Sequence, residues 1–402
     1  MAKRAVILGG ARTPMAEWVG GKRGDGEPGG ALASVSALDL GAAAARGALA
    51  KTNVAAEKIS HVVMGNALQT SGDAIYGARH VALKAGVPVR VPALTVNRLC
   101  GSGIQAVVNA AHIVGEGDEF VLAGGMENMS QAPHVIRGAR GGFKLGQGQL
   151  EDSLLVALKD SYCGLLMAQT AEKLARRMGI PREEQDAYAL RSTHLGEKAA
   201  SSGVFAQEIV PVEIKRGPKT IAVDKDDHYF VNATLEGLAK LKPAFGDDGT
   251  VTAGNASGMV DGAACLVVAD ADAAKRDGLT PMAEIVAWHV VGVDPSEMGI
   301  GPAPAIRGVL EKAGLALSEV DLFEINEAFA AQYLAVEKDL GLDRDKVNVN
   351  GGAIALGHPL GATGSRLLLT LAHELARRKK TYGIASACIG GGQGIAMLIQ
   401  RV

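Results

Sequence analysis

The sequence predicts an α/β protein built from two related halves, with a further unit inserted into the first half. Three observations support this fold class. Short β-branched runs alternate with longer Ala- and Leu-rich segments, an internal repeat links the beginning of the chain to its end, and residues 129–250 follow neither pattern. Alternating strands and helices are typical of helices layered on a mostly parallel sheet.

The first half shows the alternation clearly. We expect strands over AVILGG (5–10), HVVMGN (61–66) and FVLAGG (120–125). Helices are expected over ALDLGAAAARGALAK (37–51) and GIQAVVNAAHIVGEG (103–117). The predicted order is therefore βαβα, as in α/β layers.

An internal repeat predicts the second half. A constant shift of 261 residues aligns residues 46–67 with residues 307–328, without a gap. The identical pairs are Arg46/Arg307, Gly47/Gly308, Leu49/Leu310, Lys51/Lys312, Ala55/Ala316 and Ala67/Ala328. The same shift aligns NRLCGSG (97–103) with HPLGATG (358–364). A duplicated unit is the simplest explanation, with related turns facing each other, and a site at their seam would draw on both halves.

The middle of the chain is predicted to be an inserted subdomain. It begins with glycine-rich RGARGGFKLGQGQ and continues with two expected helices, MAQTAEKLARRM and REEQDAYALRSTHLGEKAASS. Long inserts are often lids or binding loops, and a surface elaboration without function is the alternative. The expected domains are 1–128 with 251–279 for the N-terminal half, 129–250 for the insert, and 280–402 for the C-terminal half.

Composition excludes several classes of protein. Hydrophobic residues make up 48% and charged residues 21% of the chain, which is ordinary globular composition. The net charge of -2 provides no general attraction for nucleic acid or an anionic membrane. No uninterrupted run of 18 apolar residues and no secretory signal is found. A cytoplasmic protein without nucleic-acid or membrane partners is expected.

The cysteines predict neither a metal site nor a disulfide framework. Cys100, Cys163, Cys265 and Cys388 are far apart and form no CxxC pair. A functional cysteine in this chain would therefore act through its thiolate.

Cys100 is a candidate nucleophile. It lies in VNRLCGSGIQAV, between an expected strand and a helix that should begin near Gly101. Strand, sharp turn and helix form the layout of a nucleophile elbow. A helix N-terminus offers partial positive charge and free N–H groups, so a lowered thiol pKa and an oxyanion partner are expected. Burial as a small hydrophobe is the alternative.

His358 is a candidate base. It lies in NVNGGAIALGHPLGATGSRLLLTLAHEL, before a helix expected to begin near Gly364, and in the repeat register of Asn97. The constrained backbone between Gly357 and Pro359 would hold the ring toward a nucleophile. An exposed loop histidine is the alternative, and it loses weight if the matched turns of the two halves meet.

Two further motifs end expected strands. In IASACIGGGQGIAML, Cys388 precedes three glycines whose N–H groups can approach a ligand closely. In FEINEAFAAQ, Asn326 could orient a water or a carbonyl, with a helix cap as the alternative. Two cysteines and a histidine suggest one covalent nucleophile and one acid/base, whereas a buried cysteine before a turn is the alternative for Cys388.

These motifs together resemble the thiolase superfamily of acetyl-CoA acetyltransferases and 3-ketoacyl-CoA thiolases. NRLCGSG, AGGMENMS, TAGNASG, NEAFA, GHPLGATG and CIGGGQG occur in the order of the family, and the resemblance runs from Arg12 almost to the C-terminus. It implies duplicated βαβαβαββ halves in a five-layered αβαβα core with an inserted loop domain. The repeat and the insert agree with this fold.

The resemblance implies an acyltransferase that carries out reversible Claisen condensation and thiolysis, in which two acetyl-CoA give acetoacetyl-CoA and CoA. Cys100 would carry the acyl group, His358 would activate its thiol, and Cys388 would move the proton at the α-carbon. One oxyanion hole would use the N–H groups of Cys100 and Gly390, and the other His358 with a water held by Asn326. No metal or cofactor is implied, because the thioester already acidifies the α-carbon and coenzyme A is a substrate.

The resemblance also suggests contacts for coenzyme A. Ser257 would lie near the pantetheine amides, and Met167, Met298 and Phe329 would form apolar walls. Relatives form dimers and tetramers, so a homodimer or homotetramer is expected.

Two departures from the short-chain group concern the substrate. Leu165 and Leu166 stand where an aromatic residue and a histidine commonly precede Met167. A 3-ketoacyl-CoA thiolase of broader chain length, acting in fatty-acid β-oxidation, is therefore the alternative function. Tyr229 and Phe230 stand where an arginine often lies near the adenine, so stacking is expected to hold the adenosine end.

Three rival functions fit the sequence less well. An oxidoreductase would need a GxGxxG fingerprint, which ILGGARTP does not provide. A ketosynthase or hydroxymethylglutaryl-CoA synthase would work with one reactive cysteine, so Cys388 argues against it. A lipid-binding or scaffold protein without catalysis would be expected to lose Cys100, His358 or Cys388.

Overall fold

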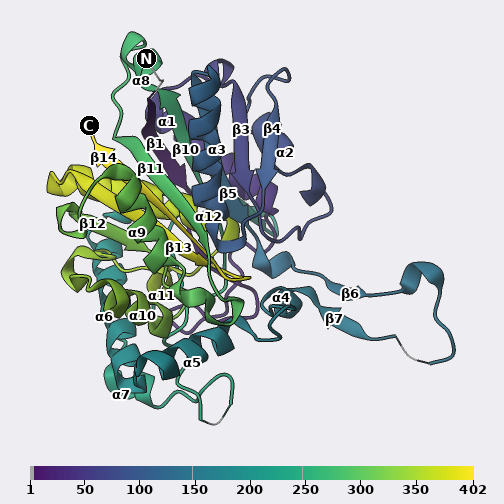
Figure 1. Ribbon diagram of the computed structural model, residues 1–402. Coiled ribbons are helices and arrows are strands. Elements are labelled where there is room, and N and C mark those ends of the chain that lie inside the picture. Colours follow the sequence, from purple (N-terminus) through teal and green to yellow (C-terminus); the bar gives the residue numbers. More distant parts are fainter. Residues whose placement is uncertain (1–3, 147, 247) are drawn as a thin grey trace.

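The computed structural model describes residues 4–146, 148–246 and 248–402 and confirms the predicted α/β fold class (Figure 1). Ten strands form one hydrogen-bonded sheet in the order β12-β13-β14-β11-β1-β10-β5-β3-β4, and β2 pairs with β10. The first half supplies β1 (Ala5–Arg12), β2 (Ala16–Glu17), β3 (His61–Gly65), β4 (Ala93–Val96), β5 (Phe120–Glu127) and β10 (Val260–Asp270). The second half supplies β11 (Ala283–Gly292), β12 (Leu322–Ile325), β13 (Tyr382–Ile389) and β14 (Gln393–Arg401).

The expectation of a mostly parallel sheet is wrong. Among the named strands of this sheet, as far as the structure describes the chain, the pairs β3–β4, β3–β5 and β12–β13 are parallel and the others are antiparallel. Parallel neighbours need a long crossover, whereas antiparallel neighbours can follow a tight turn. Strand β14 follows β13 through the glycines at 390–392, so it returns antiparallel. The run of glycines seen in the sequence is the feature that produces this pairing.

The helices and strands form five layers. The outer helices of the first half are α1 (Ala37–Thr52) and α2 (Gly77–Lys84), and those of the second half are α9 (Pro302–Ala313) and α10 (Ala330–Leu340). Between the two sets of strands lie α3 (Ser102–Glu116) and α12 (Leu360–Arg378). Separate apolar clusters fill the two outer interfaces and the central one. Within the described residues, the two sets of strands are joined by the short antiparallel pairing of β1 with β11.

The duplicated unit predicted from the repeat is visible in the structure. Strands β3 and β12, which begin at His61 and Leu322, occupy equivalent places in their halves. The central helices α3 and α12 cross at the matched glycines Gly103 and Gly364. A Cβ added to Gly103 would lie 2.4 Å from the backbone nitrogen of Ser365. The repeat-related turns therefore pack against each other, as expected.

The insert carries most of the remaining elements. Its helices are α4 (Ser153–Ala157), α5 (Met167–Met178), α6 (Arg182–Ser201) and α7 (Leu235–Ala239), and the first helix motif coincides with α5. Two hairpins complete it, β6 (His134–Ile136) with β7 (Leu150–Asp152), and β8 (Val212–Arg216) with β9 (Lys219–Val223). Helix α5 packs on α10, and α6 packs on α10 and α11 (Ala353–Leu356). Helix α8 (Ala271–Arg276) lies outside the insert and follows β10.

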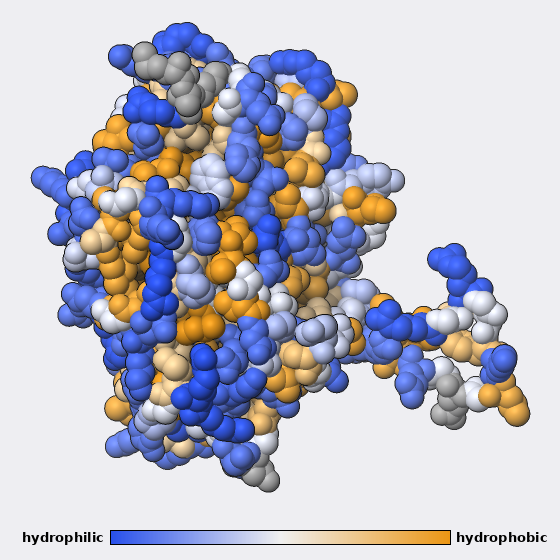
Figure 2. Space-filling view, viewed as in Figure 1, coloured by the Kyte–Doolittle hydropathy of each residue, from blue (hydrophilic) through white to orange (hydrophobic). Residues whose placement is uncertain are grey.

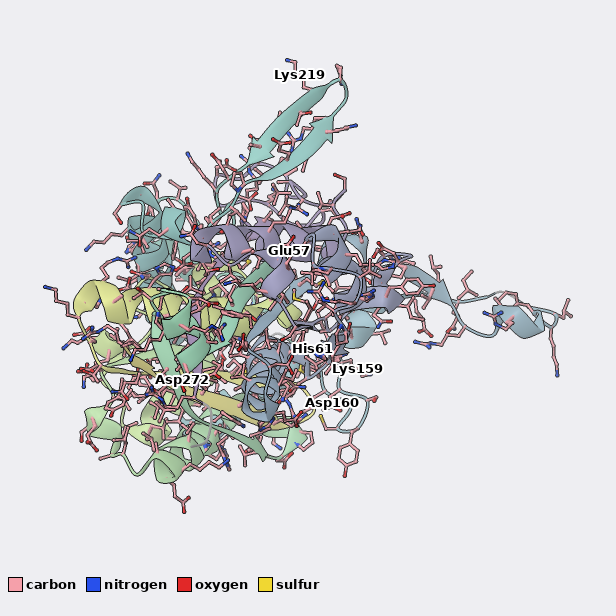
Figure 3. All side chains as sticks on the ribbon, turned by 90° about the horizontal axis from the view of Figure 1, so that it is seen from above. Glu57, His61, Lys159, Asp160, Lys219 and Asp272 are labelled. Carbon is pink, nitrogen blue, oxygen red and sulfur yellow. The ribbon has the colours of Figure 1, made fainter. Side chains whose placement is uncertain are left out.

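Two hairpins stand out from the body. The arm of β6 and β7 extends to one side in Figure 1, and Figure 2 shows apolar side chains along it, where Phe143, Leu145 and Leu150 are exposed. Figure 3 shows Lys219 at the tip of the β8–β9 hairpin. Within the described ranges, no helix combines the length and the apolar character needed to cross a membrane.

Candidate active site

Cys100 lies in a strained turn between β4 and α3. The turn forms a 3₁₀ helix, η3 (Leu99–Gly101), and Leu99 has a left-handed φ of 45°. The side chain of Asn97 accepts from the N–H of Leu99 at 2.9 Å. The hydroxyl of Ser102 accepts from the N–H of Arg98 at 2.9 Å and donates to the carbonyl of Leu99 at 2.7 Å. Two side chains thus hold a conformation that a leucine rarely adopts.

The expected lowering of the Cys100 pKa is wrong. Burial raises the pKa of the Cys100 thiol to about 11, the N–H of Gly390 hydrogen-bonds to it and opposes this, and the Glu127 carboxylate raises it further. Helix α3 begins only at Ser102, so Cys100 precedes the first helical turn. The thiol is therefore protonated at neutral pH and needs a base.

His358 is fixed in position by its backbone and its ring. Its N–H donates to the carbonyl of Gly258 at 2.9 Å. The ring Nδ1 lies 2.6 Å from the hydroxyl of Thr363, and this hydroxyl donates to the carbonyl of Pro359 at 3.1 Å. The hydroxyl has one proton, so it accepts from Nδ1–H, and Nε2 carries the lone pair. Helix α12 begins at Leu360, four residues earlier than expected.

The environment of His358 keeps the ring neutral. Burial lowers the pKa of His358 to about 3, and the positive charge of Arg366 adds to this effect. The Nδ2 of Asn326 lies 3.3 Å from Nε2 and donates to it. The backbone N–H of Asn326 donates to the carbonyl of Ser386 at 2.9 Å, which places the amide at the end of β12. A neutral imidazole whose Nε2 carries no proton can accept one from a thiol.

Cys388 lies behind Cys100 at the end of β13. Its side chain is buried, and burial together with the charge of Cys100 raises its pKa well above the usual range. A Cβ added to Gly101 would lie 2.6 Å from the side chain of Ile389, so the turn that carries Cys100 packs against the end of β13. Gly390 follows within the turn, and a Cβ on it would lie 3.2 Å from the side chain of Leu99 and 3.3 Å from the sulfur of Met167. The glycine lets its backbone approach Cys100.

Cys100 and His358 open onto one cavity of about 500 Å³. Predicted coenzyme A contacts that line the same cavity are Leu166, Met167, Phe230, Ser257, Met298 and Phe329. Asn326, Cys388 and Gly390 are not among its lining residues and lie behind His358 and Cys100. Leu165 and Tyr229 do not line it either. Leu166, whose backbone is extended, faces the cavity in place of Leu165. Tyr229 packs against a separate apolar cluster.

Two family models match nearly the whole chain. The model described as thiolase, N-terminal domain, matches residues 5–272, and the model described as thiolase, C-terminal domain, matches residues 279–401. The chain belongs to the thiolase family. The curated relatives described next are named 3-ketoacyl-CoA thiolase and acetyl-CoA acetyltransferase, and both names denote acyltransferases.

The chain is 54% identical to the mitochondrial 3-ketoacyl-CoA thiolase of Homo sapiens, over 93% of this chain and 95% of the relative. It is 48% identical to an acetyl-CoA acetyltransferase of Cupriavidus necator, over 98% of this chain and 99% of the relative. A crystal structure of the human mitochondrial thiolase in complex with CoA has a TM-score of 0.94 and 51% identity, covering 100% of this chain and 98% of that one. Both relatives are thiolases, and this protein is an enzyme of the same kind.

Several residues of this thiolase site were missed by the sequence reasoning. The additional side chains that line the cavity include Trp18, Met129, Leu155, Leu158, Phe245, Met259 and Leu360. Met129 and Leu360 lie within motifs already noted, AGGMENMS and GHPLGATG, and so carried a signal. Trp18 and Leu155 lie in loops and in a short helix, where no pattern of the sequence indicates which side faces a ligand.

Two buried carboxylates, also missed, brace the thiolase loops. Glu127 accepts from the N–H groups of Ala67, Leu68 and Gly361 at 2.9 to 3.1 Å. Burial raises the pKa of Glu127 to about 7, and these N–H donors oppose the rise. Glu127 thereby ties the His358 loop to the first half.

Within the described residues, no group of three or more His, Cys, Asp or Glu is arranged to hold a metal ion.

The second carboxylate is Glu327, next to Asn326. Tyr188 and Ser192 of α6 each donate to it at 2.6 Å. Asn348 donates at 2.8 Å, and the N–H of Ile354 donates at 3.1 Å. The insert, the segment before His358 and the end of β12 therefore meet at one buried group.

Proposed function

We propose that the enzyme condenses two molecules of acetyl-CoA to acetoacetyl-CoA and CoA, and runs the reverse thiolysis, through an acyl group on Cys100. One observation carries this proposal. At the end of a mostly apolar cavity, a protonated thiol is near an N–H donor from Gly390, a histidine whose Nε2 carries a lone pair, and a second thiol. These groups suit acyl transfer followed by carbon–carbon bond formation.

In the first half-reaction, Nε2 of His358 takes the proton of Cys100, and the thiolate attacks the thioester carbonyl. The N–H groups of Cys100 and Gly390 stabilise the oxyanion, and such a donor typically contributes about 3 kcal/mol in the transition state. The bond from the carbonyl carbon to the sulfur of CoA then breaks. Cys388 starts as a thiol because its pKa is raised, so it can protonate the departing CoA thiolate.

In the second half-reaction, the Cys388 thiolate takes a proton from the methyl group of the second acetyl-CoA. The enolate oxygen is stabilised by protonated His358 and by a water held by Asn326, as the resemblance implies. The carbanion attacks the acetyl carbonyl on Cys100, and the Cys100 sulfur leaves and recovers its proton from His358. Both cysteines and His358 end in their starting protonation states, and no metal or redox cofactor takes part.

Dialysis against EDTA should leave thiolysis unchanged.

Coenzyme A is the proposed ligand of the cavity. The human relative has been crystallised in complex with CoA. In this chain, Ser257 supplies a hydroxyl for the pantetheine arm, and Met167, Met298 and Phe329 supply apolar walls. Phe230 is proposed to stack with the adenosine end, and its ring lies edge-on to His228 with centroids 5.8 Å apart.

The proposal is tested by weighing the intact protein after incubation with acetyl-CoA. The wild type should gain one acetyl group, and Cys100→Ala should gain none. An acetyl adduct that persists on Cys100→Ala would show that the nucleophile is another residue.

A second candidate is a 3-ketoacyl-CoA thiolase of broader chain length. Leu166 favours it, because an apolar side chain at the cavity wall tolerates added methylenes, each of which contributes about 0.8 kcal/mol when buried. We expect thiolysis of acetoacetyl-CoA together with measurable thiolysis of six- to eight-carbon substrates. In Leu166→His, the ratio of kcat/KM for eight carbons to that for four should fall several-fold. An unchanged ratio, or a wild type inert on eight carbons, rules this candidate out.

A further inference from the structure

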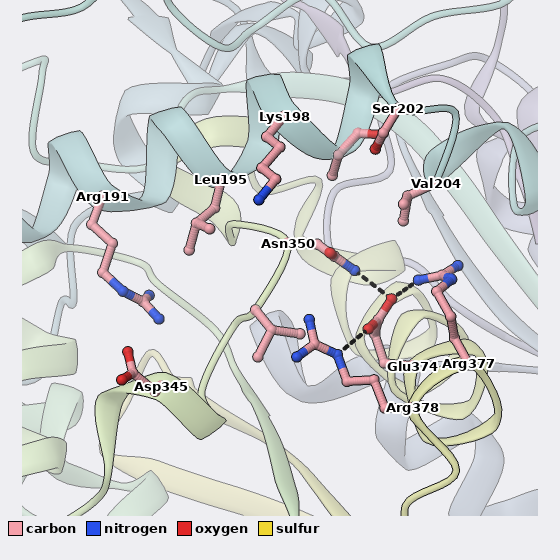
Figure 4. Close-up of a pocket in the computed structure, with 12 residues that line it drawn as sticks. Arg191, Leu195, Lys198, Ser202, Val204, Asp345, Asn350, Glu374, Arg377 and Arg378 are labelled. Atoms are coloured by element: carbon pink, nitrogen blue, oxygen red, sulfur yellow. Dashed lines mark hydrogen bonds and ion pairs between the residues drawn. The ribbon is translucent and has the colours of Figure 1, made fainter.

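A second cavity, of about 610 Å³, lies away from the catalytic residues. It is a cleft between α6 and the C-terminal end of α12, bordered by residues 345–350 (Figure 4). None of Cys100, His358 and Cys388 lines it. Neither the acyl transfer nor the binding of coenzyme A in the first cavity uses this cleft.

Positive side chains line the cleft from two helices. Arg191 and Lys198 come from α6, and Arg377 and Arg378 come from the last turn of α12. Figure 4 shows Arg191, Lys198 and Arg378 directed into the space between the helices. The carboxylates that line it are Glu374 and Asp345, so the four cations exceed the anions.

Glu374 organises one side of the cleft. It is buried and accepts from Nδ2 of Asn350 at 2.8 Å and from Nε of Arg378 at 2.7 Å, and it pairs with Arg377. One carboxylate therefore fixes two guanidinium groups and neutralises only one of them. The terminal amino groups of Arg378 are left to face the cleft.

The opposite side is also held in place. Nη2 of Arg191 donates to the carbonyls of Arg344 at 2.7 Å and Val347 at 3.2 Å. Across the described ranges, the ammonium of Lys198 makes no hydrogen bond or ion pair, and Asp345 forms no ion pair with these cations. Neutralising the end of α12 would account for Arg377 and Arg378. It does not account for two cations on α6 that face them.

We propose that this cleft binds a small organic anion that carries two or more phosphate charges. One guanidinium group can donate two parallel hydrogen bonds to the oxygens of a phosphate, and Lys198 adds a flexible point charge. Leu195, Val204 and Val349 give the cleft an apolar side that suits the organic part of such a ligand. The volume lies within the usual range for small-molecule sites.

The proposal can be tested with ADP as the probe, by calorimetry and hydrogen exchange on the full chain. Wild type should bind ADP saturably and slow the exchange of residues 345–350, whereas adenosine should not bind there. The double variant Lys198→Gln, Arg378→Gln should weaken ADP at this site at least about tenfold, because two charge-assisted contacts are lost. Lys275→Gln on α8, which removes one exposed charge elsewhere, should bind as the wild type does.

Three results would overturn the proposal. They are the absence of saturable ADP binding, equal affinity in the double variant and wild type, and an equal loss in Lys275→Gln. Acetoacetyl-CoA thiolysis by the double variant should stay at the wild-type rate, because neither residue touches the first cavity. That rate confirms that the variant is folded, and it separates this test from the test of the proposed function.

Discussion

The turns at 97–103 and 358–364 descend from one repeated unit but do different chemistry. The repeat register matches Asn97 with His358, and Cys100 with Gly361. The first turn presents its thiol to the cavity, whereas the second buries a glycine where a Cβ would lie 2.6 Å from the carbonyl of Met126. After duplication, one copy supplies the nucleophile and the other supplies the base.

The matched hydroxyls of the two turns make the same kind of contact with different results. Ser102 donates to the carbonyl of Leu99 and accepts from a backbone N–H, so it shapes the Cys100 turn. Thr363 donates to the carbonyl of Pro359 and accepts from the His358 ring, so it sets a tautomer. A structural contact in one half has become a chemical one in the other.

The largest expected effect is loss of the base. In His358→Asn, acylation of Cys100 at pH 7 should fall by about 10³-fold, the middle of the range for general-base catalysis. Because the pKa of the thiol is about 11, the thiolate fraction increases about tenfold for each unit by which the pH is raised toward that value. The acylation rate of the variant should therefore recover steeply between pH 7 and 10. An acylation rate of the variant that does not change with pH, measured by stopped flow or by mass spectrometry of quenched samples, would contradict the role of His358.

The next effect concerns packing where the second turn has no side chain. Gly361→Ala should lower the free energy of unfolding by about 2–3 kcal/mol, because the new Cβ meets the backbone of Met126 and Gly65. Gly115→Ala in α3 is the control, since nothing lies within 4 Å of its Cβ and alanine favours helices by about 0.5–1 kcal/mol. Urea titration measures both. Equal stability of the two variants would show that the turn relaxes freely.

The smallest effect separates the two hydroxyls. Thr363→Val should lower kcat about tenfold with little change in KM, because the ring loses the acceptor that fixes its tautomer. Thr363→Ser should restore it. Ser102→Ala should cost less than about threefold, because the N–H of Gly101 still donates to the carbonyl of Arg98 at 2.9 Å and holds the turn. The reverse order of the two losses would mean that the turns have been assigned the wrong roles.

The sequence predicted the fold well where the signal is local or repeated. The repeat anticipated the packing of the related turns where α3 and α12 cross, and the helix expected over MAQTAEKLARRM coincides with α5. The pairing directions within the sheet were not predictable, because β1–β10, β10–β5 and β11–β14 are antiparallel pairs between strands that lie far apart in the sequence. The resemblance predicted that Cys100, His358 and Cys388 share one site. In the structure Cys100 and His358 line one cavity, and Cys388 is buried at the end of β13.

The electrostatics of the site could not be predicted from the sequence. Cys100 was expected to have a lowered pKa from its place before a helix, yet its surroundings include Glu127 and apolar side chains from distant segments. Burial by these segments outweighs a partial helix charge. Leu165 and Tyr229 were also expected near the substrate from their positions in the sequence. Their neighbours Leu166 and Phe230 face the cavity instead. Side-chain direction in irregular segments depends on tertiary packing.

The central claim is that the two halves supply cysteines with separate tasks, Cys100 for acyl transfer and Cys388 for the proton at the α-carbon. The most direct test follows one turnover of Cys388→Ser with acetyl-CoA, with acetylation measured by intact mass and acetoacetyl-CoA by chromatography. We predict acetylation of Cys100 at close to the wild-type rate, because CoA can also leave as a thiolate without a proton from residue 388, and a fall in condensation of at least about 10²-fold, because a serine hydroxyl is a poor base. Acetylation that falls as steeply as condensation in a folded variant, or an acetyl group mapped to Cys388 in the wild type, would contradict the claim.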